Sequence, residues 1–350
     1  MKRITIKDLA AHAKVSRGTV DRVLHNRGQV SQEVKDKIQR AIKDLGYKPN
    51  IIARTLAQNN DYNIAVLIPN PEMDEFWNKP YQGIEEVLTD VETFGVSVNY
   101  YYFDNNDVTS FIDAGKRILS DSPDGILMAS EFYHESLELL DKINARGIPV
   151  SLIMTQVDHE LGSNYIGQDS FQSGVVVGRL FDTTVKDSEK HILIINLGAF
   201  YNNTLQIQKK VEGLKKYFNG REDFKMYMSE ELYFKDEKLL RDKIISALND
   251  HPQVNGIFVT NSRSKYIADI VKEFQRERDI CFIGYDIIAD NITYLNNGVI
   301  DYLINQNPDM QGAKGMKRLV DHLVYDRDFG KAEYIPSDIV IKENVAFYID

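Results

Sequence analysis

The sequence predicts an α/β protein with a small all-α head and a large two-lobed body that contains two parallel, doubly wound sheets. Three observations lead to this fold class. Residues 1–60 contain three segments with apolar residues at helical spacing. After residue 61, short β-type runs alternate with amphipathic helices, which is typical of parallel sheets covered by helices. The strand runs are also too numerous for one ordinary sheet, so two α/β halves are expected.

Capping signals define the three helices of the head. Thr5 is followed three residues later by Asp8, which is the capping-box pattern at the start of a helix. Ser16 and Ser31 are the expected N-caps of the second and third helices. Gly46 is expected to end the third helix.

The first two helices are separated by only a few residues, which indicates a helix-turn-helix. The second helix of this motif enters the major groove, and its N-terminal residues contact base edges. Here those residues are Arg17, Gly18 and Thr19, with Arg22 one turn further on. An Arg can bind guanine through two hydrogen bonds, and a Thr methyl can contact a thymine methyl. The head is therefore expected to bind double-stranded DNA; the alternative is an ordinary three-helix bundle with a solvated polar face.

The distribution of charge supports a DNA-binding head. Residues 1–60 hold 13 Lys and Arg against 5 Asp and Glu, a net charge of +8. The rest of the chain holds 29 basic and 47 acidic residues, a net charge of −18. A basic head on an acidic body fits a phosphate-binding module joined to a part that does not bind phosphate.

The head resembles the LacI/GalR family of bacterial transcription regulators through the segments TIKDLAAHAKVS, TVDRVL, QVSQEV, LGYKPN and IARTLA. The resemblance implies a helix-turn-helix domain over 1–49 and a hinge helix or linker over 50–61. Two copies of the hinge would pair across a dimer axis, with Leu56 wedged into the minor groove at the operator centre. So short a helix is unstable alone in water and would fold only on DNA; a plain linker is the alternative. The residues expected to contact DNA are Thr5, Ser16, Arg17, Gly18, Thr19, Arg22, Asn26, Arg27, Tyr47, Asn50, Ala53, Arg54 and Leu56.

Asp21 departs from the family pattern, which has a small polar residue at this position. A carboxylate there repels phosphate. It could accept a hydrogen bond from a cytosine amino group, or orient Arg22. The operator sequence therefore stays open.

The body is expected to hold its ligand in a cleft between two halves, with a break near Gly162–Ile166. Parallel sheets bind ligands at the carboxyl ends of their strands, and two facing halves bring those ends together. The predicted strands are Asn63–Ile68, Val96–Phe103, Gly125–Ala129, Val150–Ile153, His191–Asn196, Lys225–Met228, Gly256–Thr260, Cys281–Tyr285, Asp301–Asn305 and Ile335–Ile341.

The body resembles a type I periplasmic sugar-binding protein. The resemblance is carried by PEMDEFWNKPYQGIEEV, YIGQDSFQSGVVVGRLF, KKVEG, IFVTNS, IGYD and NQNPDMQGAKGM. It implies an effector-binding and dimerisation domain over 62–350. The N-terminal lobe would comprise about 62–163 and 290–324, and the C-terminal lobe about 164–289 and 325–350.

Several strand ends carry aromatic, carboxylate or amide side chains suited to a polyhydroxyl ligand. Aromatic rings stack on the C–H face of a sugar, and carboxylates and amides distinguish hydroxyl positions. Each residue alone has an ordinary alternative, such as a helix cap for Asp169 or core packing for the Phe-Trp pair. The resemblance implies that the effector contacts Asp74, Phe76, Trp77, Lys210, Asn261, Asp286 and Gln306, and Asp169, which opens a helix after a strand, is expected to bind it as well.

Two departures from sugar-binding relatives bear on the ligand. Lys210 stands where an Arg is usual, and Met154-Thr155 stands where ribose- and hexose-binding relatives commonly carry Asp-Arg. The ligand is therefore not expected to be bound as simple ribose is. The charge of Lys210 also leaves an anionic sugar as an option.

These features together predict a homodimeric transcription regulator, a repressor, that binds a pseudo-palindromic DNA operator and responds to a small carbohydrate or sugar derivative. The alternatives are a solute-binding protein of the transport type and an effector-independent DNA-binding protein. The sequence contains no G-x-x-x-x-G-K-[ST], H-E-x-x-H or G-x-S-x-G motif, so no enzyme activity is expected. No cofactor, metal or membrane partner is expected. The protein is expected to be located in the bacterial cytoplasm, associated with the nucleoid.

Overall fold

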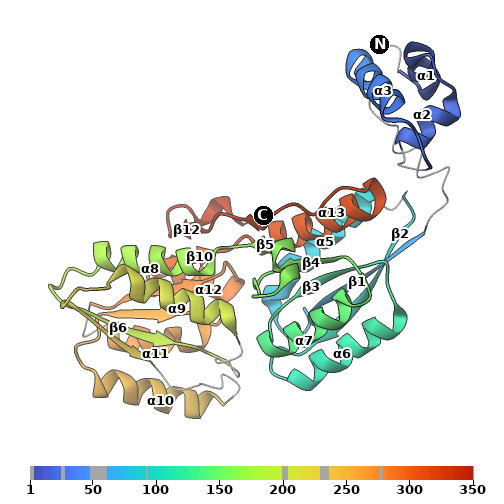
Figure 1. The fold of residues 1–350 in the computed structure, drawn as a ribbon. Coiled ribbons are helices and arrows are strands. Elements are labelled where there is room, and N and C mark those ends of the chain that lie inside the picture. Colours follow the sequence, from blue (N-terminus) through green and yellow to red (C-terminus); the bar gives the residue numbers. More distant parts are fainter. Residues whose placement is uncertain are drawn as a thin grey trace. The chain divides into compact units, whose positions relative to one another are not determined.

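The computed structural model describes residues 4–24, 28–47, 61–91, 94–198, 204–228, 236–275 and 279–349. The chain divides into two units, Met1–Asn59 and Asn60–Asp350, which we treat separately (Figure 1). Residues 50–60 of the expected hinge lie outside the described residues. So do six of the positions expected to contact DNA: Asn26, Arg27, Asn50, Ala53, Arg54 and Leu56.

The head contains the expected helices α1 (Ile6–Ala13), α2 (Arg17–Leu24) and α3 (Gln32–Leu45). Both hydrogen bonds of the capping box between Thr5 and Asp8 are present, which confirms the predicted start of α1. The hydroxyl of Ser16 accepts a hydrogen bond from the backbone N–H of Thr19 at 3.1 Å, so it caps α2. Gly46 ends α3 in the left-handed conformation, as expected.

Ser31 is the N-cap residue of α3, as expected, but without a side-chain cap. Its hydroxyl makes no capping hydrogen bond. The residue is exposed, so water can satisfy the first backbone N–H groups of this helix in its place.

The first half of the body is built on a sheet of six parallel strands (Figure 1). Helices α5 (Asn78–Val91) and α13 (Pro308–Tyr325) pack on one face, and α6 (Val108–Asp121) and α7 (Tyr133–Asn144) on the other. Successive residues of β1 alternate between these two cores, so both faces are buried. In spatial order the strands are β11 (Glu333–Tyr334), β5 (Tyr165–Gly167), β4 (Val150–Ile153), β3 (Gly125–Ala129), β1 (Tyr62–Pro69) and β2 (Val96–Phe103).

The second half repeats this plan. Helices α8 (Ser170–Thr184) and α9 (Leu205–Tyr217) cover one face of its sheet. Helices α10 (Glu237–Asp250), α11 (Lys265–Gln275) and α12 (Ala289–Asn296) cover the other face. In spatial order the strands are β12 (Asp338–Val340), β10 (Tyr302–Asn305), β9 (Cys281–Tyr285), β8 (Gly256–Val259), β6 (Lys190–Ile195) and β7 (Phe224–Met228), with only β12 antiparallel.

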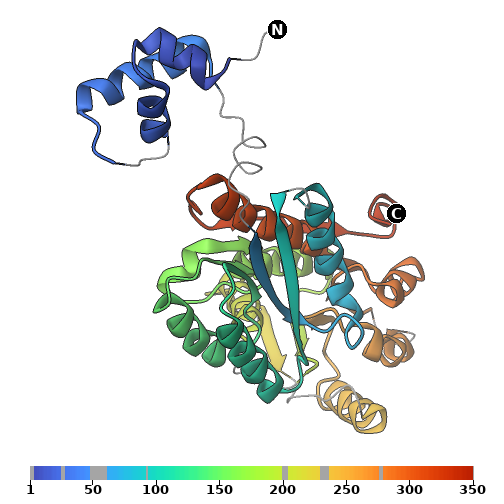
Figure 2. The same ribbon diagram turned by 90° about the vertical axis from the view of Figure 1, so that its right-hand side faces the viewer.

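Two segments lie in the opposite half from the one expected. Residues 290–324 were assigned to the first half, yet β10 pairs with β9 of the second sheet, and its Leu303 and Ile304 are fully buried in that half. Of residues 290–324, only α13 packs on the first sheet (Figure 2). Within the expected strand Ile335–Ile341 only β12 forms, and β11, which directly precedes that range, joins the first sheet although 325–350 was expected in the second half. Pro336 lies between them and lacks the N–H that a continuous strand would need.

Each half contains a helix pair whose backbones touch. A Cβ atom at Gly83 of α5 would collide with the backbone carbonyl of Asp309 in α13. In the second half, a Cβ atom at Gly174 of α8 would collide with the backbone carbonyl of Lys210 in α9. Glycine is required where backbones approach this closely. The α8–α9 contact fixes the position of α9, and with it the side chain of Lys210.

Candidate functional site

Strand ends from both halves of the body line one cavity. Its walls come from segments that follow β1, β2 and β3 in the first half and β6, β8, β9 and β10 in the second, together with the start of α9. The cavity encloses about 700 Å³ of empty space, part of which is open to solvent. The expected cleft is thus where these polar strand ends converge.

Seven of the eight residues expected to bind an effector line this cavity. They are Asp74, Phe76, Trp77, Lys210, Asn261, Asp286 and Gln306.

Asp169 does not line the cavity. Its carboxylate accepts a hydrogen bond from the backbone N–H of Gln172 at 2.9 Å and caps α8. A carboxylate that caps a helix and one that binds a ligand look the same in a sequence, because both directly follow a strand or loop. The helix-cap interpretation is the one that the structure supports.

A pair of aromatic rings forms one wall of the cavity. Phe76 and Trp77 lie edge to face with their ring centres 5.4 Å apart. They belong to a short 3₁₀ helix, Glu75–Trp77, that begins at Asp74, whose carboxylate accepts from the Phe76 backbone N–H at 3.2 Å. Trp77 is only 2% exposed, so most of its surface serves the core of the first half.

The ammonium group of Lys210 is held by the protein itself. Its Nζ donates to the backbone carbonyl of Thr260 at 3.1 Å and lies 3.6 Å from the centre of the Tyr285 ring. Burial lowers the pKa of Lys210, and the neighbouring carboxylates of Asp286 and Glu131 counteract this effect. Lys210 therefore balances negative charge inside the cavity and does not project as a free cation.

Asp286 sits at the end of β9 with a backbone φ of 66°, a conformation that non-glycine residues rarely adopt. Its carboxylate accepts two hydrogen bonds from Nε2 of Gln306, at 3.0 and 3.1 Å. Nε2 of Gln168 in turn donates to Oε1 of Gln306 at 2.8 Å. Burial raises the pKa of Asp286, while Lys210 and Gln306 lower it. This chain of contacts joins the second sheet to the segment that connects the halves.

Glu131 was not expected from the sequence, although it lines the cavity. It stands just after β3, and its carboxylate accepts hydrogen bonds from Thr155 and from Gln206. Burial raises the pKa of Glu131 to about 7, despite the opposing effects of Thr155, Lys210 and Gln206. Other lining residues that the sequence analysis missed are Asn105, Phe132, Asn196, Gln206, Thr260, Ser262 and Arg263. Most of them follow a strand directly, which is the signal that could have identified them.

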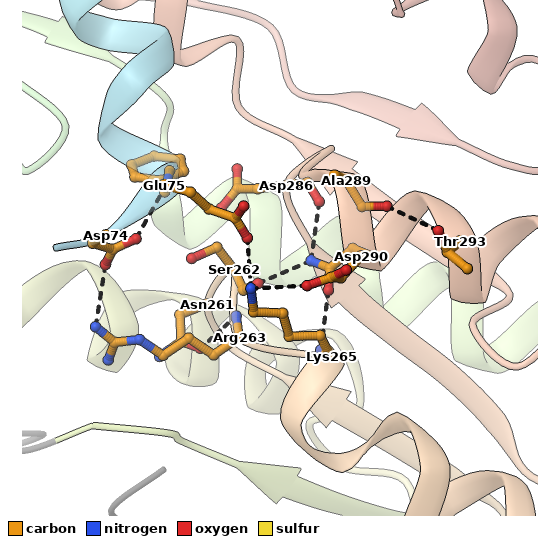
Figure 3. Close-up of polar contacts among 12 residues, drawn as sticks. Asp74, Glu75, Asn261, Ser262, Arg263, Lys265, Asp286, Ala289, Asp290 and Thr293 are labelled. Carbon is orange, nitrogen blue, oxygen red and sulfur yellow. Dashed lines mark hydrogen bonds and ion pairs between the residues drawn. The ribbon is translucent and has the colours of Figure 1, made fainter. Parts of the chain in front are cut away.

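Two ion pairs connect the halves at the mouth of the cavity (Figure 3). The guanidinium of Arg263 lies 3.3 Å from the carboxylate of Asp74. The ammonium of Lys265 lies 2.7 Å from Glu75 in the first half and 3.0 Å from Asp290 in its own half (Figure 3). The two halves of the body are therefore in contact at this edge of the cavity.

The cavity carries more negative than positive groups. Its charged lining residues are the carboxylates of Asp74, Glu131 and Asp286 and the cations Lys210 and Arg263. Arg263 is paired with Asp74, and Lys210 lies near both other carboxylates. An added anion would therefore find both lining cations already beside carboxylates.

In the head, the start of α2 presents the residues expected to contact bases. Arg17, Gly18 and Arg22 are exposed and Thr19 is partly exposed. The Nε of Arg22 donates to the backbone carbonyl of Gly18 at 3.2 Å, and the Thr19 hydroxyl lies 2.8 Å from that of Ser16.

Two other positions expected to contact DNA have structural contacts in the head. Tyr47 is only 9% exposed and packs in the core of the head. Thr5 caps α1. Both side chains therefore have a structural role in the head, in addition to any contact with DNA.

Within the part of the chain that the structure describes, no group of three or more His, Cys, Asp and Glu side chains could hold a metal ion. None of the helices described there has the length and apolar character needed to cross a membrane.

Both the body and the head match known protein families. Residues 64–326 match the periplasmic binding protein domain family. The chain belongs to this family. Residues 5–50 match the bacterial regulatory proteins of the lacI family, so the head is a LacI-type helix-turn-helix domain.

Several regulators are similar in sequence. Catabolite control protein A of Staphylococcus xylosus is 29% identical over 190 residues, 54% of this chain and 52% of that protein. Catabolite control protein A of Staphylococcus aureus is 31% identical over 42% of this chain and 43% of that protein. The match therefore spans about half the length of each. The HTH-type transcriptional regulator RegA of Clostridium saccharobutylicum is 26% identical over 63% of this chain and 72% of its own length.

Solved structures share the fold of the body. A Bacteroides fragilis protein assigned as a LacI transcriptional regulator superimposes with a TM-score of 0.74 at 25% identity, covering 83% of this chain and all of that one. GanP, a glucose-galactose binding protein from Geobacillus stearothermophilus, gives a TM-score of 0.71 at 21% identity, covering 82% of this chain and 99% of that one.

Proposed function

We propose that this protein is a sequence-specific DNA-binding transcription regulator, a repressor, whose operator affinity is set by a carbohydrate-like effector in the cavity of the body. One observation carries the proposal: a LacI-type head is joined to a body whose polar strand ends, from both halves, converge on a single cavity. A head alone would explain DNA binding, and a body alone would explain solute capture. Their combination in one chain favours a regulator over both alternatives.

The effector we propose is an uncharged polyhydroxyl compound. Lys210 suggested an anionic sugar as an option, but its ammonium is already held by Thr260, Tyr285 and nearby carboxylates. The other polar groups of the lining include the amides of Asn105 and Asn196. Amides both donate and accept hydrogen bonds, which suits hydroxyl groups that do the same.

The coupling between effector and DNA would act through the two halves. An effector that contacts both halves stabilises one arrangement of them relative to others. In a homodimer this arrangement would set the spacing of the two heads on a pseudo-palindromic operator. Such coupling requires that the effector bind the two arrangements with different affinity.

We propose that the cavity binds its ligand without converting it. Its carboxylates are engaged with Gln206, Gln306, Lys210 or Arg263, and Thr155, whose hydroxyl donates to Glu131, does not line the cavity. Because its partner is operator DNA, we place the protein at the nucleoid in the bacterial cytoplasm. Its mass in solution, measured by light scattering, tests the homodimer.

A ligand screen coupled to DNA binding tests the proposed function. The full-length protein is screened by thermal shift against neutral sugars, sugar acids and sugar phosphates. Operator fragments are selected from genomic DNA, and each hit is titrated against the protein–DNA complex. We expect neutral sugars to raise the melting temperature and to lower operator affinity. Stabilisation without any change in DNA affinity would disprove the coupling, and stabilisation by sugar phosphates alone would disprove the charge argument.

The head is tested with Arg17→Ala, compared with Lys43→Ala on α3 as a control for a lost positive charge. Loss of a base contact should reduce specific operator affinity by about 10–100-fold, because such contacts contribute about 1–3 kcal/mol of discrimination. The control should lower specific and non-specific affinity by similar, smaller factors. Equal effects of the two variants would disprove the base contact.

A further inference from the structure

A second hollow adjoins the central cavity on its outer side. It contains about 1,070 Å³ of empty space, part of which is open to solvent. Four residues line both spaces: Asp74, Asn105, Ser262 and Arg263. Only one layer of side chains therefore separates the two. The Asp74–Arg263 ion pair, which joins the halves, lies in this layer (Figure 3).

Asn105 has an unused acceptor in this layer. Its Oδ1 is buried and has no hydrogen-bond partner among the described residues. A buried polar atom without a partner costs about 1–3 kcal/mol, so such atoms are rare unless a ligand or water completes them. Because Asn105 lines both spaces, a hydroxyl group located between them would be its natural partner.

The outer hollow offers an aromatic surface as well as polar groups. Tyr266, at the start of α11, lines it and is 37% exposed, and Met73 on the facing loop is 59% exposed. The two side chains come from opposite halves of the body. Exposed aromatic and apolar groups beside carboxylates and amides are what the two faces of a sugar ring require.

Charge in the outer hollow resembles that of the central cavity. Its carboxylates are Glu72, Asp74, Glu75 and Asp104, against the cations Arg263 and Lys265. Both cations are already in ion pairs with carboxylates of the first half. The two spaces thus favour the same uncharged class of ligand.

We infer that the effector is an uncharged glycan or glycoside of at least two sugar units that occupies both spaces. One unit lies in the central cavity, and the next lies in the outer hollow against Tyr266. The linkage between the units passes Asn105 and the Asp74–Arg263 pair. This inference rests on the proposed function, and it adds the size of the ligand and the residues that select it.

Calorimetric titration of the full-length protein with matched sugars tests the inference. The probes are D-glucose with cellobiose and maltose, D-galactose with lactose, D-xylose with xylobiose, and D-mannose with mannobiose. We expect at least one disaccharide to bind about tenfold or more tightly than its monosaccharide, which corresponds to about 1.4 kcal/mol.

Tyr266→Ala should remove this difference by lowering disaccharide affinity about tenfold and leaving monosaccharide affinity unchanged. Tyr102→Ala is the matched control, since Tyr102 is equally exposed at 36% and lines neither space. Asn105→Ala provides a second variant and should weaken the disaccharide more than the monosaccharide.

The possible failures are distinguishable. If monosaccharides bind and disaccharides bind no more tightly, or if Tyr266→Ala has no more effect than Tyr102→Ala, the inference is overturned and the proposed function stands. If no sugar of either size binds, the proposed carbohydrate response fails and the inference fails with it.

Discussion

Gln206 donates hydrogen bonds to both carboxylate oxygens of Glu131, at 3.3 and 3.2 Å. The contact joins the start of α9 in the second half of the body to the end of β3 in the first. Because burial raises the pKa of Glu131 to about 7, this contact between the halves involves a carboxyl group that changes charge near neutral pH.

The first prediction concerns the pH dependence of stability. The pKa of Glu131 is higher in the folded protein than the ordinary value of 4.5 that is expected in the unfolded chain. Between those two values the folded state keeps a proton that the unfolded state has lost, so the free energy of unfolding should fall as pH rises from about 4.5 to about 7. Melting temperatures measured across this range should decline less steeply in Glu131→Gln.

Glu138→Gln is the control for this prediction, because Glu138 is exposed on α7. It should leave the slope of the wild-type curve unchanged. Parallel curves for the wild type and Glu131→Gln would show that Glu131 titrates normally in the folded protein, contrary to the upward shift of its pKa.

The second prediction concerns Asp286. Asp286→Asn should lower effector affinity about 10–100-fold, because a hydrogen bond to a charged group contributes about 1.5–3 kcal/mol. Asn tolerates the left-handed backbone that Asp286 adopts, with φ of 66°, so the variant should fold. Titration of the screened effector gives the affinity, and operator binding without effector should stay at the wild-type level.

Asp169→Asn is a matched control for that variant. Asp169 caps α8 outside the central cavity, and Asn is an equally good N-cap. Its effector affinity should therefore equal that of the wild type. A large loss in Asp169→Asn would return Asp169 to the binding site and contradict the helix-cap interpretation.

The third prediction separates the two ion pairs of Lys265. Glu75→Gln removes the pair between the halves, whereas Asp290→Asn removes the pair within one half. Partly exposed ion pairs contribute about 0.2–1 kcal/mol, so Glu75→Gln should weaken effector binding up to about fivefold. The loss should shrink at high salt. Asp290→Asn should have a smaller effect, and equal effects in both variants would show that the halves are not held by this contact.

Most of the residues predicted from the sequence line the cavity, because they occupy a recognisable position. Asn261, Asp286 and Gln306 each follow a buried strand, and parallel topology brings such positions together. Glu131 occupies the same kind of position but was missed. Asp169 was included although its carboxylate is a helix cap. Position after a strand therefore identifies candidates, but the direction of the side chain depends on packing that is not visible in the sequence.

The assignment of β10 to the wrong half has a related cause. The residues Leu303 and Ile304 indicate a buried strand, and this prediction is confirmed. Which sheet the strand joins depends on β9, its parallel partner, and on where the chain crosses between the halves. These are non-local relationships, and neither changes the local pattern of the strand itself.

The last prediction concerns the close contact between α5 and α13. Gly83→Ala places a methyl group against the backbone carbonyl of Asp309, which cannot rotate away. The helices must then separate, and overpacking of this kind costs about 1–3 kcal/mol. Gly115→Ala on α6 is the matched control, because its methyl group meets only the side-chain end of Leu139, at 3.0 and 3.2 Å, which can move. There the gain in helix propensity, about 1 kcal/mol, should offset the crowding.

The melting temperatures of the two variants should therefore differ. Gly83→Ala should melt several degrees below the wild type, and Gly115→Ala should melt close to it. If Gly83→Ala lowers only the melting temperature, the contact between α5 and α13 supports the fold and has no effect on the cavity. If Gly83→Ala also alters effector affinity in the folded protein, the contact between α5 and α13 also positions the cavity wall, because α5 begins directly after Phe76 and Trp77. Equal melting temperatures for Gly83→Ala and the wild type would show that the two backbones do not touch in solution.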